Sequence, residues 1–185
     1  MVSDYVGASV LCFSVHPETA GVYFLLGKER FNPLWPVSSC KWSDFGGRVG
    51  LEDTCIEDTA TREFEEETMG VVDVYLGLQE RQYVCRLDLG VAPKKFVVFV
   101  KQIEWDPTIS TRFTSLRRNA VVQGNSATLE KCRLWYWSLP HIRHAVACNG
   151  VLLRSDGKPE FCRKPFMVSL GVLLPHLSFT HPSVF

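Results

Sequence analysis

The sequence predicts a single α/β domain, and three observations support this prediction. The chain has 185 residues, which is within the usual size of one domain and long enough to bury a hydrophobic core. Short runs of β-branched and aromatic residues alternate with segments that have the apolar spacing of helices. Hydrophobic residues make up 46% of the chain and charged residues 22%, which is typical of a folded globular protein.

The expected strands are short apolar runs bounded by polar, glycine-rich or proline-rich turns. The run VVFV has the continuous apolar character of a strand that is buried on both faces. The expected strands are residues 7–15, 22–27, 71–78, 81–87, 94–105 and 133–139.

Prolines and glycines mark the expected connections and helices. Residues 32–39 contain two prolines and should form a loop, and residues 44–50 form a glycine-rich turn. Residues 106–130 are polar and lack strong periodicity, so we expect a long loop with one helical turn at most. Pro140 opens a short helix, and residues 165–177 form an apolar helix with a proline near each end.

Composition argues against several classes of protein. Lys and Arg together number 20, as do Asp and Glu, so the formal net charge is zero. A neutral chain gives no general electrostatic case for a nucleic-acid coat or a membrane-surface protein. We therefore expect neither a membrane nor DNA as a partner, and the sequence gives no indication of the oligomeric state.

Cysteine usage and the N-terminal residues predict a cytoplasmic protein in a reducing compartment. The seven cysteines are an odd number without a CxxC pair, which argues against a structural zinc site and a disulfide framework. The first residues lack the basic segment of a signal peptide, and no apolar run has the ~18 residues of a membrane span. The sequence is also compatible with a mature form from which a leader has been removed.

The segment TREFEEET, residues 61–68, places four glutamates within five positions. Thr54 and Glu57 fit a capping box, so we expect a helix that begins near residue 55, runs to about Met69 and stops at Gly70. Like charges at this spacing destabilise an isolated helix. A solvated charged face is the simplest explanation for such a segment.

The helical periodicity separates these side chains into faces. Ile56, Ala60 and Phe64 form an apolar stripe that suits packing on a sheet. Three glutamates, Glu63, Glu66 and Glu67, share a narrow arc beside that stripe, and Arg62 is placed to pair with Glu66 at i+4. Glu65 points away from this arc, towards solvent.

Carboxylates that converge at the edge of a core repel one another, and bound divalent cations would offset that repulsion. Mg²⁺ prefers hard oxygen ligands and keeps waters and substrate phosphates in its coordination shell. Gly46 and Gly47 would let the backbone approach the same place. A cation site is therefore the alternative to a solvated face.

Residues 46–71, GGRVGLEDTCIEDTATREFEEETMGV, resemble the Nudix box, G-x5-E-x7-R-E-U-x-E-E-x-G-U, where U is a bulky aliphatic residue. Arg62, Glu63, Glu66 and Glu67 match the charged positions of REUxEE, and Phe64 matches U. The resemblance implies a Nudix-type α/β/α sandwich with a mixed β-sheet. It also implies that the glutamates hold Mg²⁺ or Mn²⁺ against a diphosphate, while the arginine orients one of them.

This chain departs from the Nudix pattern at two places. One extra residue separates Gly47 from Arg62, so the upstream acidic position is either Glu52 or Asp53. Met69 stands where the box has glycine, and Gly70 follows it. The helical register of the expected metal ligands is unaffected by either change.

The resemblance implies hydrolysis of a diphosphate linked to a further group, and it indicates which residues carry this reaction. The expected metal ligands are the three glutamates and Gly47, with Arg62 as a catalytic partner. The general base is one of the helix glutamates or Glu130, which precedes the late strand. The expected substrate-binding residues are Gly46, Gly47, Arg117, Arg118, Lys131 and Trp42.

The expected substrate is a nucleotide diphosphate, with the 5′ cap of mRNA as the preferred candidate and m7GDP as its product. The REFxEETxG ending resembles that of decapping members of the family. Inositol pyrophosphates, dinucleoside polyphosphates and nucleotide sugars are the alternative substrates. A Nudix module without catalytic activity that binds RNA or a protein is the alternative from another class, although the intact glutamates argue against it.

Overall fold

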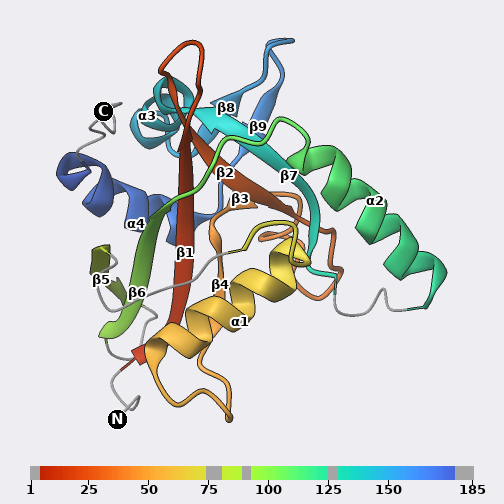
Figure 1. The fold of residues 1–185 in the computed structure, drawn as a ribbon. Coiled ribbons are helices and arrows are strands. Elements are labelled where there is room, and N and C mark those ends of the chain that lie inside the picture. The colour runs from red at the N-terminus through yellow and green to blue at the C-terminus, as the bar shows by residue number, and fades with distance from the viewer. Residues whose placement is uncertain (1–4, 74–80, 89–92, 125–128, 178–185) are drawn as a thin grey trace, which may run out of the picture.

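The computed structural model describes residues 5–73, 81–88, 93–124 and 129–177, and these residues form three layers. A mixed β-sheet lies in the middle, with two helices against each face (Figure 1). This arrangement confirms the α/β/α sandwich and the mixed sheet that the sequence predicts.

The central sheet has the strand order β3-β2-β1-β6-β5, with β4 paired to β1 and β7 paired to β2. Only the β1–β6 pair is parallel; the other pairs of strands described in this sheet are antiparallel. The strands of the sheet are β1 (Tyr5–Val15), β2 (Val22–Glu29), β3 (Trp42–Ser43), β4 (Phe45–Arg48), β5 (Arg81–Asp88), β6 (Pro93–Gln102) and β7 (Lys131–Ser138). A separate hairpin joins β8 (Val151–Leu153) to β9 (Pro159–Phe161).

The helices divide between the two faces of the sheet. They are α1 (Ile56–Thr68), α2 (Ile109–Val122), α3 (Leu139–Ala147) and α4 (Lys164–Leu173), and a 3-10 turn, η2 (Leu174–His176), follows α4. Phe64 of α1 and Phe113 of α2 belong to the core on one face, whereas Ile142 of α3 and Leu170 of α4 belong to the core on the other. Alternate residues of β1 and β6 serve the two cores, which is why their runs are almost continuously apolar.

Most of the expected strands and both C-terminal helices are confirmed. The exception among the strands is residues 71–78: Val71–Asp73 form a turn rather than a strand, and residues 74–78 lie outside the described residues. The two helices begin where Pro140 and Pro165 place them, within the first turn of α3 and of α4.

The loop expected over residues 106–130 is wrong, because this segment contains the fourteen-residue helix α2. Asp106 precedes the N-cap residue Thr108 and accepts hydrogen bonds from its backbone and hydroxyl, at 2.8 and 2.6 Å. Among the residues of α2, only Ile109 and Phe113 are buried. A helix that buries two side chains has little apolar periodicity, so the sequence pattern is that of a loop.

The glycine-rich turn expected over residues 44–50 is also wrong in its central part. Gly46 and Gly47 lie in the extended strand β4, paired with Ser9 and Ala8 of β1. The strand brings the two glycines beneath α1, which contacts both β1 and β4. The glycines are therefore required for close packing, rather than for a reversal of the chain.

The cysteines and the helices have two further features. All seven cysteines lie in the described residues and none of them forms a disulfide there, with Cys12, Cys85 and Cys162 buried. None of the helices in the described segments is long and apolar enough to cross a bilayer.

Candidate functional site

The N-terminal cap of α1 differs from the capping box expected from the sequence. Cys55, rather than Thr54, is the N-cap residue, and Asp58, rather than Glu57, is the acidic partner. The carboxylate of Asp58 accepts hydrogen bonds from the backbone N–H groups of Thr54 and Cys55, at 2.9 and 3.1 Å. These bonds lower the pKa of Asp58 to about 2, with the Thr54 hydroxyl as the largest contributor.

The faces of α1 are arranged as the periodicity predicts. Ala60 and Phe64 are fully buried, and the Phe64 ring meets that of Phe45 on β4 edge to face, with centroids 5.2 Å apart. Glu65 is exposed on the other side of the helix. The apolar stripe therefore fixes the rotation of α1 about its axis and directs Glu63, Glu66 and Glu67 towards the edge of β4.

The departure at Met69 has a conformational explanation. Met69 caps the C-terminus of α1 in the left-handed region, with φ of 56°, and Gly70 follows at 66°. Glycine adopts this conformation without strain, which accounts for glycine at this position of the Nudix pattern. The backbone here keeps the conformation that the pattern requires, although methionine occupies the position.

Of the two acidic candidates upstream of the helix, Asp53 contacts Arg62. Both carboxylate oxygens of Asp53 accept hydrogen bonds from the Arg62 guanidinium at 3.0 Å, and Thr59 donates a further bond at 2.7 Å. The guanidinium also contacts Glu63 at 2.9 Å and Glu66 at 3.6 Å, so the expected i+4 pair is confirmed. Arg62 is thereby held in one position between an anchor and two of the helix glutamates.

The two glycines of β4 leave room for carboxylates of α1. A Cβ atom on Gly47 would lie 2.4 Å from the carboxylate of Glu63, and one on Gly46 would lie 2.3 Å from the backbone of β1. The Gly46 N–H donates to Oε2 of Glu67 at 2.8 Å. Side chains at these positions would displace Glu63 or push β4 away from β1.

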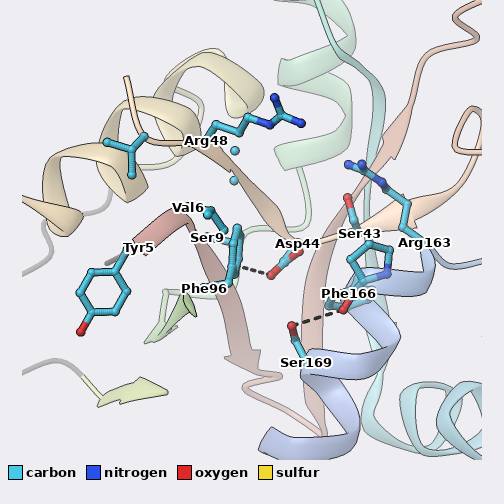
Figure 2. Close-up of a pocket in the computed structure, with 14 residues that line it drawn as sticks. Tyr5, Val6, Ser9, Ser43, Asp44, Arg48, Phe96, Arg163, Phe166 and Ser169 are labelled. Atoms are coloured by element: carbon cyan, nitrogen blue, oxygen red, sulfur yellow. Dashed lines mark hydrogen bonds between the residues drawn. The ribbon is translucent and has the colours of Figure 1, made fainter. Parts of the chain in front are cut away.

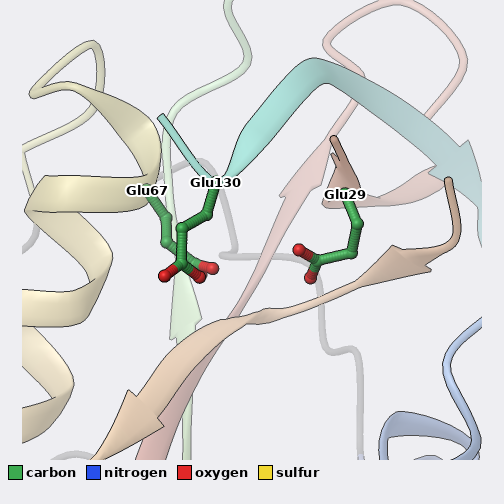
Figure 3. A group of neighbouring side chains, drawn as sticks. All are labelled: Glu29, Glu67 and Glu130. Carbon is green, nitrogen blue, oxygen red and sulfur yellow. The ribbon is translucent and has the colours of Figure 1, made fainter. Parts of the chain in front are cut away.

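A cluster of three carboxylates lies where α1, β2 and β7 meet. Glu67 comes from α1, Glu29 from the end of β2 and Glu130 from the residue before β7, and Figure 3 shows their carboxylates turned towards one another. One oxygen of each lies within 4.8 Å of the others. Glu67 is buried, Glu29 is almost so, and Glu130 is exposed.

Lys131 occupies the interior side of this cluster. Its ammonium donates to Glu29 at 2.6 Å and to Ser43 at 2.7 Å, and it lies 3.1 Å from Oε1 of Glu67. Only 1% of its side chain is exposed. Lys131 is therefore an internal counter-ion, and the structure places it away from the surface at which a substrate phosphate would bind.

The electrostatic environment differs between the carboxylates. Burial raises the pKa of Glu67 to about 8, against the opposing effect of Lys131. Burial also raises the pKa of Glu63, and the neighbouring charges of Glu66 and Glu130 add to this effect. Burial alone would raise the pKa of Glu29, but Lys131 and nearby groups lower it overall. Crowded, partly desolvated carboxylates of this kind favour an additional positive charge.

Two cavities adjoin β4. The cavity on the carboxylate side has a volume of about 610 Å³ and is lined by Glu29, Glu63 and Glu130 among others. The second cavity has a volume of about 560 Å³. Four residues line both cavities, so the two meet along β4: Gly46, Gly47, Arg48 and Arg163.

The second cavity combines aromatic rings with an acidic group. Tyr5, Phe96 and Phe166 line it, and Asp44 projects into the same region (Figure 2). The Ser9 hydroxyl donates to Asp44 at 2.6 Å. Desolvation raises the pKa of Asp44, and the hydrogen bond from Ser9 opposes the increase only in part. An aromatic pocket with one carboxyl group suits a planar, hydrogen-bonding ligand.

The expected substrate-binding residues are not all near the carboxylates. Gly46 and Gly47 line the cavity beside them, whereas Trp42 is buried with its indole N–H donating to Glu160 at 3.3 Å. Arg117 donates to the backbone oxygen of Lys131 at 3.1 Å, and Arg118 lines a separate cavity beside β7.

Glu29 and Asp44 lie beside the candidate site, and no sequence pattern identifies either of them. Glu29 ends an apolar run, where a single acidic residue normally marks the return of the chain to solvent. Asp44 lies in the segment before Gly46 and Gly47, which the sequence predicts to be a turn. An aspartate is common in turns, so it does not stand out there. The alternation along β2 could have drawn attention to Glu29, since it shares a face with the buried Gly27 and Leu25.

The residues present fit a divalent cation. The donors are hard carboxylate oxygens from three elements of the fold, supplemented by Glu63 and Glu66 and by the accessible backbone of Gly47. The buried ammonium of Lys131 shows that this region already accommodates a positive charge between two carboxylates. Such a donor set is the type that Mg²⁺ and Mn²⁺ prefer.

Comparisons with known proteins support the fold. No family model and no curated protein sequence matches the chain. Among solved structures, the Nudix hydrolase RenU from M. Smegmatis matches with a TM-score of 0.52 and 12% identity, covering 94% of this chain and 86% of that one. A mutT/nudix family protein from Listeria innocua matches with a TM-score of 0.50 and 12% identity, covering 94% and 96%. The Nudix resemblance seen in the sequence is therefore confirmed at the level of the fold.

Proposed function

Because the chain has the Nudix fold, we propose that it is a pyrophosphohydrolase that cleaves a phosphoanhydride bond with the help of Mg²⁺ or Mn²⁺. The observation that carries this proposal is the convergence of carboxylates from α1, β2 and β7 beside Gly46 and Gly47. Two adjoining cavities along the same strand offer space for a diphosphate and for the group attached to it.

The cation would be held by the helix glutamates that the Nudix resemblance implicates, one of which also belongs to the cluster. These are Glu63, Glu66 and Glu67, with Glu130 of the cluster and the backbone of Gly47 beside them. A bound divalent cation supplies charge neutralisation for phosphate oxygens and lowers the pKa of a coordinated water. Glu29 remains paired with Lys131 and Arg163, at 2.6 and 3.1 Å, and holds the interior side of the cluster.

Glu130 is the best-placed general base. It is exposed at the mouth of the cavity, where its carboxylate can accept a proton from the attacking water and return it to solvent. Glu67 is less suited to this role, because it is buried and its oxygens already contact the Gly46 N–H and Lys131. Glu63 and Glu66 are the remaining candidates, and both contact the Arg62 guanidinium, at 2.9 and 3.6 Å.

Two arginines have separate roles in this proposal. Arg62, anchored by Asp53, orients Glu63 and Glu66 and makes the site rigid. Arg48 is exposed and lines both cavities, so its guanidinium is available to bind phosphate oxygens at their junction.

The preferred substrate is the 5′ cap of mRNA, with m7GDP as the product. N7-methylguanine is positively charged and presents N–H donors, which complements a carboxylate between aromatic rings. Asp44, Phe96 and Phe166 provide that combination in the second cavity. The diphosphate would then extend past Gly46 and Gly47 towards the carboxylates.

A panel of substrates tests this proposal. Purified protein with Mg²⁺ or Mn²⁺ should release m7GDP from capped RNA in preference to diphosphoinositol phosphates, Ap4A, ADP-ribose or NADH. Asp44→Asn should raise KM for capped RNA more than it lowers kcat, because it weakens base binding without altering the carboxylates. Turnover of another substrate without activity on capped RNA would support the hydrolase activity and contradict the cap as substrate. Inactivity on the whole panel would contradict both the hydrolase activity and the cap as substrate.

A further inference from the structure

A third cavity, of about 860 Å³, lies between α2, β7 and the β8–β9 hairpin. Among the described residues, none lines both this cavity and either of the two cavities beside β4. We call it the β7 cleft and define it by four of its lining residues: Arg118, Arg133, Trp135 and Trp137.

One face of β7 forms the aromatic wall of this cleft. Alternation along a strand places Arg133, Trp135 and Trp137 on the same face. Trp137 is buried at 4% exposure and packs edge to face against Trp42, with centroids 5.4 Å apart, whereas 52% of Trp135 is exposed. The cleft therefore presents one accessible indole beside a fixed pair of tryptophans.

The indole N–H of Trp137 has no hydrogen-bond acceptor among the described residues. The neighbouring Trp42 differs, because its N–H donates to Glu160 at 3.3 Å. A buried donor without an acceptor is costly, and such groups are rare in folded proteins. The Trp137 nitrogen is closed to solvent, so Trp137 forms part of the wall of the cleft and its N–H does not face the open space.

The charges that line the cleft leave it positive. Arg118 and Arg133 are exposed and form no ion pair within the described part of the chain. The acidic group of the cleft, Glu160, is already paired with Lys28 at 2.6 Å and lies 3.8 Å from Arg154. An anionic ligand would find two uncompensated guanidinium groups, one from α2 and one from β7.

We propose that the β7 cleft binds single-stranded nucleic acid. One base stacks on Trp135, and neighbouring phosphates bind Arg118 and Arg133. Exposed aromatic rings beside cationic groups are how proteins bind unpaired strands. The site is local, which is consistent with a chain whose formal net charge is zero.

Binding can be measured without hydrolysis, using a fluorescein-labelled oligouridylate in EDTA and fluorescence anisotropy. Trp135→Ala should weaken binding at least about 5-fold, because it removes the stack of one base. Arg118→Gln with Arg133→Gln should weaken it further and reduce the salt dependence by about 0.7 in slope for each arginine. The matched controls are Phe161→Ala, which removes an aromatic ring that is 50% exposed outside the cleft, and Arg143→Gln on α3.

Glu66→Gln should bind the oligonucleotide as the unmodified protein does, so this test is independent of the hydrolase proposal. An oligothymidylate competes if the strand is recognised through bases and phosphates, and uridine monophosphate competes weakly because it offers only one phosphate. The proposal is overturned if the oligouridylate does not bind, or if Trp135→Ala and Phe161→Ala have equal effects on its binding.

Discussion

Replacing Lys131 by methionine removes the internal counter-ion of the carboxylate cluster while preserving the length of the side chain. The substitution eliminates the contacts of 2.6 Å to Glu29 and 3.1 Å to Glu67, and the hydrogen bond of 2.7 Å to Ser43. The remaining carboxylates then face each other in a region where Glu67 is only 4% exposed.

The size of the effect follows from the burial of this pair. Breaking a buried ion pair by removing one partner costs about 3–5 kcal/mol, because a charge is left uncompensated away from water. Domains of ordinary stability unfold with about 5–15 kcal/mol, so the loss is a large part of the total. Urea denaturation in EDTA should show a lower midpoint with an unchanged slope.

A divalent cation should reverse part of this loss. In Lys131→Met the cluster lacks its own positive charge, so Mn²⁺ should raise the midpoint more in the variant than in the unmodified protein. The control is Lys158→Met, because the side chain of Lys158 is 76% exposed and its replacement should change stability by less than ~0.5 kcal/mol. A loss below about 1 kcal/mol for Lys131→Met would refute the reasoning based on a buried pair. An equal response of both proteins to Mn²⁺ would refute the link between Lys131 and the cation.

Three further predictions concern the helix cap, the glycine strand and the thiols. The pKa of Asp58 is lowered to about 2 from an unfolded value of about 3.9, so its contribution to stability is present above about pH 4 and is lost as the pH falls through 2. Asp58→Asn should therefore reduce the loss of stability between about pH 4 and about pH 2 in a denaturation profile. An unchanged loss would contradict the role of Asp58 in the helix cap. Gly47→Ala places a Cβ 2.4 Å from the Glu63 carboxylate, so it should reduce hydrolysis at least about tenfold in activity assays. Circular dichroism should show that the variant is folded. Full activity would contradict the close packing of Gly47 against Glu63. Iodoacetamide should modify the exposed Cys40 rapidly and Cys162 slowly, because burial raises the pKa of the Cys162 thiol to about 12. Peptide mass spectrometry measures the two rates of modification, and equal rates would contradict the burial of Cys162.

The sequence could predict those elements whose local pattern agrees with their environment. The stripe of Ile56, Ala60 and Phe64 sets the rotation of α1, so the direction of Glu63 and Glu66 followed from periodicity alone. The strands β1, β2 and β6 have apolar runs because they serve two cores, and such runs are visible in any sequence.

The remaining features depend on contacts between distant segments. Glu29 and Lys131 meet because β2 pairs with β7, and no local pattern reveals that register. The apolar periodicity does not reveal helix α2, because tertiary contacts of Ile109 and Phe113, rather than a continuous apolar face, hold it in place. The observed capping box, Cys55 with Asp58, lies one residue after the expected pair of Thr54 and Glu57. Both pairs have the spacing of a capping box, so the sequence alone does not distinguish them.

The central claim is that the converging carboxylates form a divalent-cation site, and a calorimetric titration of Mn²⁺ tests it most directly. Glu130→Gln and Glu66→Gln remove charges from the proposed site, whereas Glu65→Gln removes an equal charge from the exposed side of the same helix. We predict that Glu65→Gln retains the affinity of the unmodified protein and that the other two variants lose at least about tenfold. Equal affinity in all three variants, or no Mn²⁺ binding by the unmodified protein, would contradict the claim.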